Sequence, residues 1–177
     1  MSNSKRIIKT VASITIESAV LVWWINLIFG FSSEVGPDSS EKSGSILVFL
    51  VNLINPSLDV TLDNYQNLAA LENSEKILRK LAHMFEYGVL ALLLWLIIRN
   101  LVCLWKMKRE HAFADDCYIY IVTEVIVLII GAFDELNQTH VSGRYGSWVD
   151  VIVDGVGAAA VLLICRFAEG RNCRKKS

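Results

Sequence analysis

The fold is decided by residues 131–157, which read GAFDELNQTHVSGRYGSWVDVIVDGVG. An apolar run ends here in carboxylate and amide side chains, a short loop follows, and a second apolar run opens with two further carboxylates. Ionisable groups between two hydrophobic helices cost free energy, and charges at membrane depth usually mark a functional site. The stretch therefore predicts a polar site at the mouth of a helical membrane bundle.

The composition favours a membrane protein. Hydrophobic residues make up 54% of the 177-residue chain, and the mean hydropathy is +0.45, which is high for a soluble domain. Apolar runs occupy residues 7–31, 81–105, 118–138 and 148–168, each near the ~20 residues that cross ~30 Å of hydrocarbon. We expect an all-α polytopic membrane protein, with one domain (residues 1–177) built on a four-transmembrane-helix bundle.

None of the four runs is free of charge, since Glu17, Glu86, Glu124 and Asp154 interrupt them one apiece. A soluble four-helix protein with a very apolar core is therefore the alternative. The distribution of basic residues outside the runs favours the bilayer. The sequence assigns no role to Glu17 or Glu124.

Lysine and arginine cluster before the first run, around the loop between the second and third runs, and at the end of the chain. The loops at 32–80 and 139–147 are acidic or mixed, so the positive-inside rule places both termini in the cytoplasm. A cleaved signal peptide is the alternative for the start of the chain. Its apolar part would be too long, and no small-residue cleavage site follows. We expect a multi-pass plasma-membrane protein, and the net charge of −1 predicts no nucleic-acid partner.

The loop at 32–80 is long enough to hold structure of its own. Ile46–Ile54 is apolar but too short to span, so it is interpreted as an interfacial or re-entrant helix. Leu62–Lys80 is amphipathic at helical spacing and runs into the second membrane helix. We therefore predict a helical extracellular loop between the first two membrane helices.

Polar side chains gather on one face at the start of the second membrane helix. At ~100° per residue, Arg79, Lys80, Glu86 and Tyr87 all lie within ~60° of His83. The simpler interpretation is that the basic residues anchor the helix in the headgroup layer while Glu86 and His83 pair with each other. That interpretation does not explain why Glu86 lies deeper than the basic residues.

The third and fourth membrane helices carry polar stripes that meet this face. Glu135 and Gln138 share one stripe with Asp134 beside it, and Asp150 and Asp154 lie four residues apart on one face. These stripes lie at the ends of the two helices that the short loop joins. We therefore expect the polar groups of three helices to form one site.

Packing residues lie close to the stripe of the fourth helix. Gly155 and Ala159 form a small-xxx-small pair that permits close helix approach. Packing alone is the simpler interpretation of these glycines. We therefore assign them to the scaffold of the site.

Several chemistries fit this set of residues. His83 and Glu135 are candidates for acid–base chemistry, and Arg144 in the connecting loop provides a planar fork for phosphate or carboxylate. The spacing matches no recognised zinc pattern, so no metal is predicted. The catalytic candidates are His83, Glu86, Asp134, Glu135, Gln138 and Asp150, and the ligand-binding candidates are Arg79, Lys80, Tyr87, Arg144 and Asp154.

At these residues the chain resembles the VanZ-like family, small bacterial membrane proteins named for a teicoplanin-resistance accessory. Glu34 and Asp154 depart from the family pattern, which tends to have Gln and Asn at these positions, so the local charge balance differs. The matching motifs cover nearly the whole chain in order: Phe31-Ser32-Ser33, Arg79-Lys80-Leu81-Ala82-His83, Glu86-Tyr87-Gly88, Asp134-Glu135-x-x-Gln138, Gly143-Arg144, Asp150 and Gly155-x-Gly157.

The resemblance implies a four-helix membrane protein of the bacterial cell envelope with a link to glycopeptide resistance, and it implies no particular reaction or cofactor. Two functions follow. The protein binds a membrane lipid or peptidoglycan-precursor headgroup and lowers susceptibility to teicoplanin-type lipoglycopeptides, or it is a membrane enzyme that modifies a lipid or polyprenyl-linked headgroup by acid–base chemistry. A transporter is less favoured, because four helices without a repeat provide little machinery for alternating access.

Overall fold

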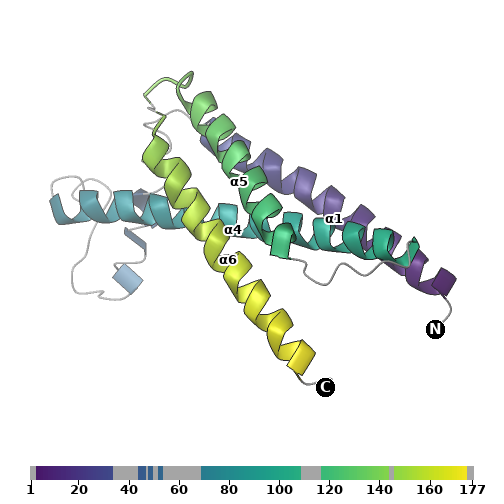
Figure 1. The fold of residues 1–177 in the computed structure, drawn as a ribbon. Helices are drawn as coiled ribbons and strands as arrows, with labels where there is room; N and C mark the ends of the chain where they lie inside the picture. Colours follow the sequence, from purple (N-terminus) through teal and green to yellow (C-terminus); the bar gives the residue numbers. More distant parts are fainter. Residues whose placement is uncertain are drawn as a thin grey trace.

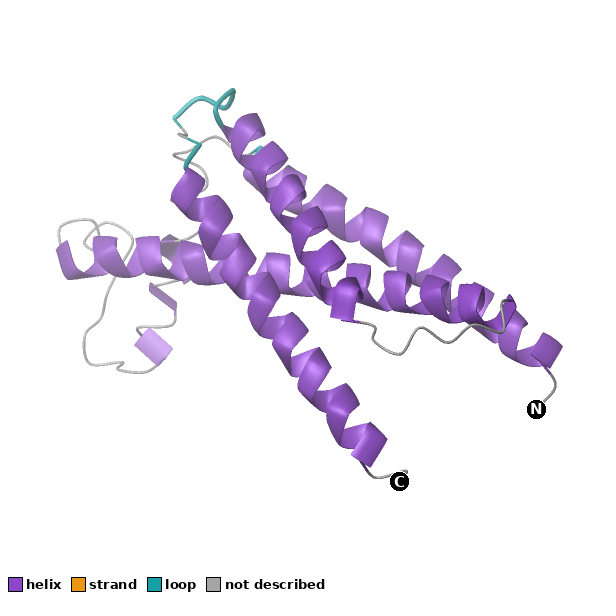
Figure 2. Ribbon diagram, viewed as in Figure 1, coloured by secondary structure: helices purple, strands orange, loops and turns teal. Residues whose placement is uncertain are grey.

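The structure is a computed structural model that describes residues 3–33, 44–46, 48–49, 52–53, 69–108, 117–143 and 146–174. Its long helices are α1 (Asn3–Ser32), α4 (Ala69–Lys108), α5 (Cys117–Gln138) and α6 (Trp148–Arg174) (Figure 1). The part of the chain that is described contains helices, turns and loops but no strand (Figure 2). The all-α fold predicted from the sequence is confirmed.

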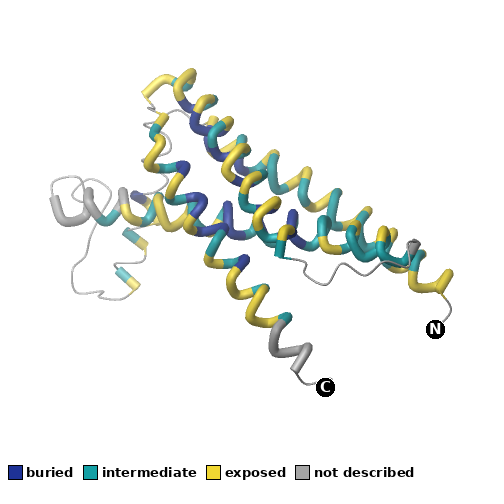
Figure 3. The backbone as a smooth tube through the Cα atoms, viewed as in Figure 1, coloured by how far each residue is buried: buried dark blue, intermediate teal, exposed yellow. Residues whose placement is uncertain are grey.

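Each long helix contains a segment that is long and apolar enough to cross a membrane. These segments are Asn3–Ser32, Ile77–Met107, Cys117–Gln138 and Trp148–Glu169. Many large apolar residues are exposed along all four helices, and Figure 3 shows where exposed positions lie along the backbone. A surface of this kind is stable against lipid rather than water. The expected four-transmembrane-helix bundle is thus confirmed.

The second membrane helix is longer than the run at 81–105 that predicted it. The amphipathic residues 69–80 continue into the apolar run without a break, so both form the single helix α4. Residues 62–68 lie outside the described part of the chain. Of the predicted short helix Ile46–Ile54, residues 46, 48–49 and 52–53 are helical, and the others also lie outside the described part.

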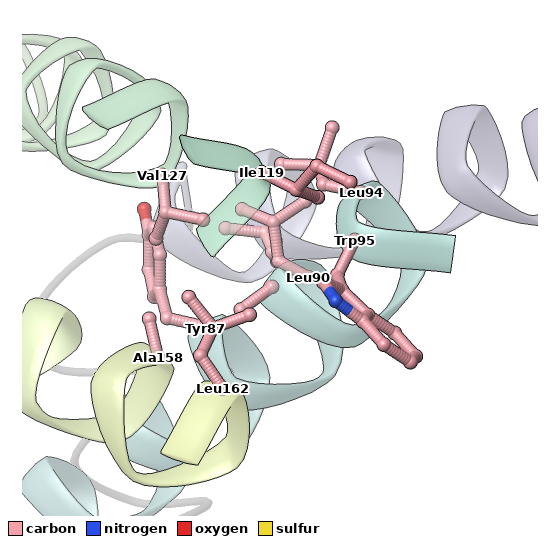
Figure 4. Close-up of a cluster of buried hydrophobic side chains, with 10 residues drawn as sticks. Tyr87, Leu90, Leu94, Trp95, Ile119, Val127, Ala158 and Leu162 are labelled. Atoms are coloured by element: carbon pink, nitrogen blue, oxygen red, sulfur yellow. The ribbon is translucent and has the colours of Figure 1, made fainter. Parts of the chain in front are cut away.

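The core lies around α4, which contacts α1, α5 and α6. Leu90 and Ala91 of α4 are fully buried, and they meet Val127 of α5 and Ala158 of α6. Tyr87 forms one end of this cluster beside Val127 and Ala158 (Figure 4). The position of Tyr87 joins the apolar core to the polar residues described below.

Glycines set the crossing of α4 and α6. A Cβ atom added at Gly157 would lie 2.7 Å from Met84 Cα, and one at Gly88 would lie 3.4 Å from the Gly157 carbonyl oxygen. Gly155 faces the other neighbour, since a Cβ there would lie 2.8 Å from Leu128 Cδ2 of α5. The two glycines of α6 therefore let both neighbouring helices approach closely.

Two polar contacts hold α1 against α4. Asn100 Nδ2 donates to both carboxylate oxygens of Glu17 at 2.9 Å, and Ser13 Oγ donates to Glu17 Oε1 at 2.8 Å. Nearer the other end of α1, Trp24 Nε1 donates to the Glu86 carbonyl oxygen at 2.9 Å. Glu17 thus has a structural role that the sequence did not predict.

Candidate functional site

The candidate site lies at the end of the bundle where α5 ends and α6 begins. We call this the polar end, and the opposite end, with the last turns of α4 and α6, the termini end. Polar side chains from α4, α5 and α6 gather there beside the short loop that joins the last two helices. We call this set the polar cluster: Lys80, His83, Glu86, Tyr87, Asp134, Glu135, Gln138, Asp150 and Asp154.

The last turn of α5 supplies the most buried part of the polar cluster. The exposed fractions are 1% for Asp134, 6% for Glu135 and 7% for Gln138. Gln138 Nε2 donates to Asp134 Oδ2 at 3.2 Å and to Glu135 Oε1 at 3.3 Å. One amide group therefore holds two adjacent carboxylates in place, as the spacing of one helical turn allows.

The start of α6 is tied to the same carboxylate. The backbone N–H of Ser147 donates to Glu135 Oε2 at 2.7 Å, and Ser147 Oγ accepts from the Val149 N–H at 3.2 Å as a helix cap. Gly146 lets the loop come this close, because a Cβ there would lie 2.5 Å from the Glu135 carbonyl oxygen. Gly143, with φ of 78°, makes the preceding turn. Glu135 is thereby fixed by backbone as well as by Gln138.

Side chains of α4 meet the carboxylates of α6. Lys80 Nζ lies 3.1 Å from Asp150 Oδ1, and both side chains are partly exposed. One turn deeper, His83 Nδ1 lies 3.9 Å from Glu86 Oε2 and 3.9 Å from Asp154 Oδ1. These two distances exceed hydrogen-bond length but lie within ion-pair range. His83 therefore lies between two carboxylates.

The innermost polar residues are Tyr87 and Asp154. Tyr87 is fully buried and Asp154 is 1% exposed. Both lie over Gly131 of α5, where an added Cβ would be 3.4 Å from Tyr87 Cε1 and 3.5 Å from Asp154 Oδ2. Neither Asp154 oxygen has a hydrogen-bond partner among the residues that the structure describes, and the Tyr87 hydroxyl lies beside the Asp134 carboxylate. Such buried polar atoms are rare in proteins and call for a functional explanation.

Carboxylates outnumber cations in the polar cluster. Asp154 interacts electrostatically with Glu86, Asp134, Glu135 and Asp150. The cations nearby are Lys80, the His83 imidazole when it is protonated, and Arg79, whose Nε is buried. The arrangement therefore favours a ligand that brings hydrogen-bond donors or positive charge.

The structure brings together most of the residues that the sequence proposed. His83, Glu86, Glu135 and Asp150 all contribute to the polar cluster, with the neighbours given above. Arg144 lies outside the described residues. Within the described part of the chain, no group of three or more His, Cys, Asp and Glu side chains is placed to hold a metal ion.

Several contacts around the candidate site were not predicted from the sequence. Ser147 donates its backbone N–H to Glu135, and Trp24 donates its indole N–H to the backbone carbonyl of Glu86. Backbone atoms are the same in every residue, so the sequence carries no specific signal for these contacts. Asn137 Nδ2 donates to Ser33 Oγ at 3.1 Å, which links α5 to the end of α1. The only signal that pointed to any of these was the Phe31-Ser32-Ser33 motif.

The comparison with family models decides the relationship. The model of the VanZ/LLP1 family matches residues 18–169, which include the second half of α1, all of α4 and α5, most of α6 and the whole polar cluster. The chain belongs to the VanZ/LLP1 family. No curated protein and no solved structure matches the chain. The residues by which the sequence resembled the VanZ/LLP1 family are thus largely those that build the site.

Proposed function

We propose that this VanZ/LLP1 family member binds the headgroup of an envelope lipid or peptidoglycan precursor in the polar cluster. The observation that carries the proposal is the convergence of carboxylates from three helices around Lys80 and His83. Sugar hydroxyls and amino groups provide the donors that such a set of acceptors requires. The partly exposed pair of Lys80 and Asp150 lies at the entrance, where a headgroup would first make contact.

In this proposal the polar end faces outward and both termini lie in the cytoplasm of a bacterial plasma membrane. The clustering of lysine and arginine near the termini supports this orientation. A precursor headgroup held at the outer face is less accessible to a lipoglycopeptide that must reach the membrane. The protein would thereby lower susceptibility to teicoplanin-type antibiotics.

Catalysis on a membrane-bound substrate is the second candidate function, and the position of His83 favours it. An imidazole 3.9 Å from each of two carboxylates is suited to general acid–base catalysis. In that case a lipid or polyprenyl-linked headgroup would be chemically changed rather than held.

One experiment separates the two candidates. Lipid extracts of cells with and without the protein are compared by mass spectrometry, and teicoplanin susceptibility is measured in the same strains. Binding predicts lower susceptibility with unchanged headgroup species, whereas catalysis predicts a new or missing species. Unchanged susceptibility together with unchanged lipids would reject both.

Arg144 tests how an anionic part of the headgroup is held. Lysine cannot reproduce the two parallel hydrogen bonds of a guanidinium. We therefore expect Arg144→Lys to behave nearly like Arg144→Ala in the susceptibility assay. Full function of the lysine variant would show that only the positive charge matters.

A further inference from the structure

A second concave region lies between α5 and α6, on the termini side of the polar cluster. The two helices are close together near their connecting loop and diverge away from it (Figure 1). The groove between them has a volume of about 330 Å³. Its walls are apolar, with Ile121 and Val125 on α5 and Leu163 on α6, and Ala159 leaves the space open.

The surroundings of the groove restrict what can fill it. Ile121, Val125 and Leu163 are 63%, 49% and 54% exposed, so in a membrane the groove opens sideways into hydrocarbon. Its apolar walls and its opening into the membrane fit the acyl chain of a lipid.

Guanidinium groups lie near the rim of the groove at the termini end. Arg99 Nε pairs with Glu169 Oε1 at 2.8 Å, and Tyr120 Oη donates to Glu169 Oε2 at 2.6 Å. Arg166 adds a second guanidinium, whose Nη1 lies 2.8 Å from Cys117 Sγ and whose centre lies 5.8 Å from the centroid of the Tyr120 ring. A guanidinium group at the membrane surface attracts the phosphate of a lipid.

The opposite end of the groove holds a carboxylate. Glu124 lines the groove there, and its Oε1 lies 3.4 Å from the position of a Cβ at Gly155. The carboxylate is thus close to the backbone of α6. Guanidinium groups thus stand at one end of the groove and a carboxyl group at the other, which orients an occupant with its anionic end toward Arg166.

We propose that this groove binds one acyl chain of an anionic phospholipid, with the phosphate of that lipid at Arg166. The site is independent of the polar cluster and of the function proposed for it. It would hold a lipid of the leaflet at the termini end as a structural ligand that fills the gap between α5 and α6.

The test uses the full chain reconstituted in vesicles of phosphatidylglycerol and phosphatidylcholine in equal amounts. After gentle extraction, lipids retained by the protein are counted by native mass spectrometry. One arginine near the surface favours an anionic lipid by about five-fold. We expect one retained phosphatidylglycerol per chain, at about that excess over phosphatidylcholine.

Variants assign the retained lipid to the groove. Ala159→Phe fills the groove and should abolish retention, whereas Ala160→Phe makes the same change at the exposed neighbouring position and should leave it unchanged. Leu163→Trp is a second filling variant at an exposed position and guards against misfolding of the first. Arg166→Gln should keep a lipid but lose the preference for phosphatidylglycerol, and Arg6→Gln, which removes an exposed cation of α1, should preserve it.

Three outcomes would overturn the proposal. The first is equal retention of the two lipids by the wild-type chain. The second is continued retention by folded Ala159→Phe and Leu163→Trp variants. The third is a lipid-free dimer that Leu163→Trp dissociates, which would make the groove an interface between two copies of the chain.

Discussion

The two ends of the bundle handle charge in opposite ways. At the termini end, Glu169 receives a guanidinium at 2.8 Å and a phenol at 2.6 Å. At the polar end, Asp154 is 1% exposed, yet its nearest charged partner given above, His83 Nδ1, is 3.9 Å away. A carboxylate that is exposed and fully paired acts as an anchor. One that is buried and incompletely paired beside a histidine is costly, so it is the better candidate for function.

The largest effect is expected from a substitution at the crossing of α4 and α6, which lies between the polar end and the termini end. Gly157→Leu would place a side chain into the Met84 backbone and separate α4 from α6, at a cost of about 3 kcal/mol or more. We expect little folded protein, measured as the monodisperse fraction after detergent extraction. Val156→Leu is the matched control, since Val156 is exposed on the same helix. Normal amounts of the Gly157→Leu protein would show that the crossing is loose.

The next prediction separates site from scaffold at the polar end. Glu135→Gln keeps an oxygen that can accept the Ser147 N–H but removes the charge, and Asp154→Asn removes a charge without changing the side-chain shape. Hydrogen bonds to charged groups contribute about 1.5–3 kcal/mol, so headgroup binding should fall about ten-fold or more. Membrane levels of both proteins should stay near normal. If the two proteins instead disappear from the membrane, the carboxylates are structural.

A smaller effect is expected at the termini end. Glu169→Gln breaks the pair with Arg99, whose side chain is 50% exposed. Exposed pairs contribute about 0–1 kcal/mol. Thermal unfolding in detergent should shift slightly, and any envelope phenotype should be unchanged. A loss of phenotype as large as that of Asp154→Asn would remove the contrast between the two ends.

The last prediction concerns which end of the bundle faces outward, and the labelling that tests it should leave function unchanged. Cys103, Cys117 and Cys165 are free thiols near the termini end, so a membrane-impermeant maleimide should leave intact cells unlabelled. A cysteine introduced at the exposed Ser142 should react without loss of function. Labelling of the native thiols from outside would reverse the proposed orientation.

Much of the fold follows from periodicity. Apolar runs of sufficient length predicted the four helices, and the helical repeat placed His83 and Glu86 on one face and Glu135 and Gln138 on another. Such a repeat identifies the residues that share a face, and short connections such as that between α5 and α6 identify helix ends that meet. The polar cluster was predictable to that extent.

Contacts to backbone were not predictable. Ser147 donates its backbone N–H to Glu135, and the Trp24 indole donates to the Glu86 backbone carbonyl. No residue type is required at the position that supplies the backbone atom in either contact. The sequence singled out Gly155 and Ala159 for close packing but did not say which neighbour each would meet. Residues two positions apart on a helix point in directions that differ by ~200°. Gly155 therefore meets α5, whereas Gly157 meets α4. The identity of the neighbour depends on tertiary packing.

One further consequence comes from the length of α4. Residues 69–87 contain neither glycine nor proline, and the helix continues without a break to Lys108. Kinks in helices arise mostly at those two residue types, so this part of α4 behaves mechanically as one stiff rod with its support at the Gly157 crossing. A displacement of the first turns of α4 is therefore passed on to Lys80 and His83, because no hinge lies between those turns and the two residues.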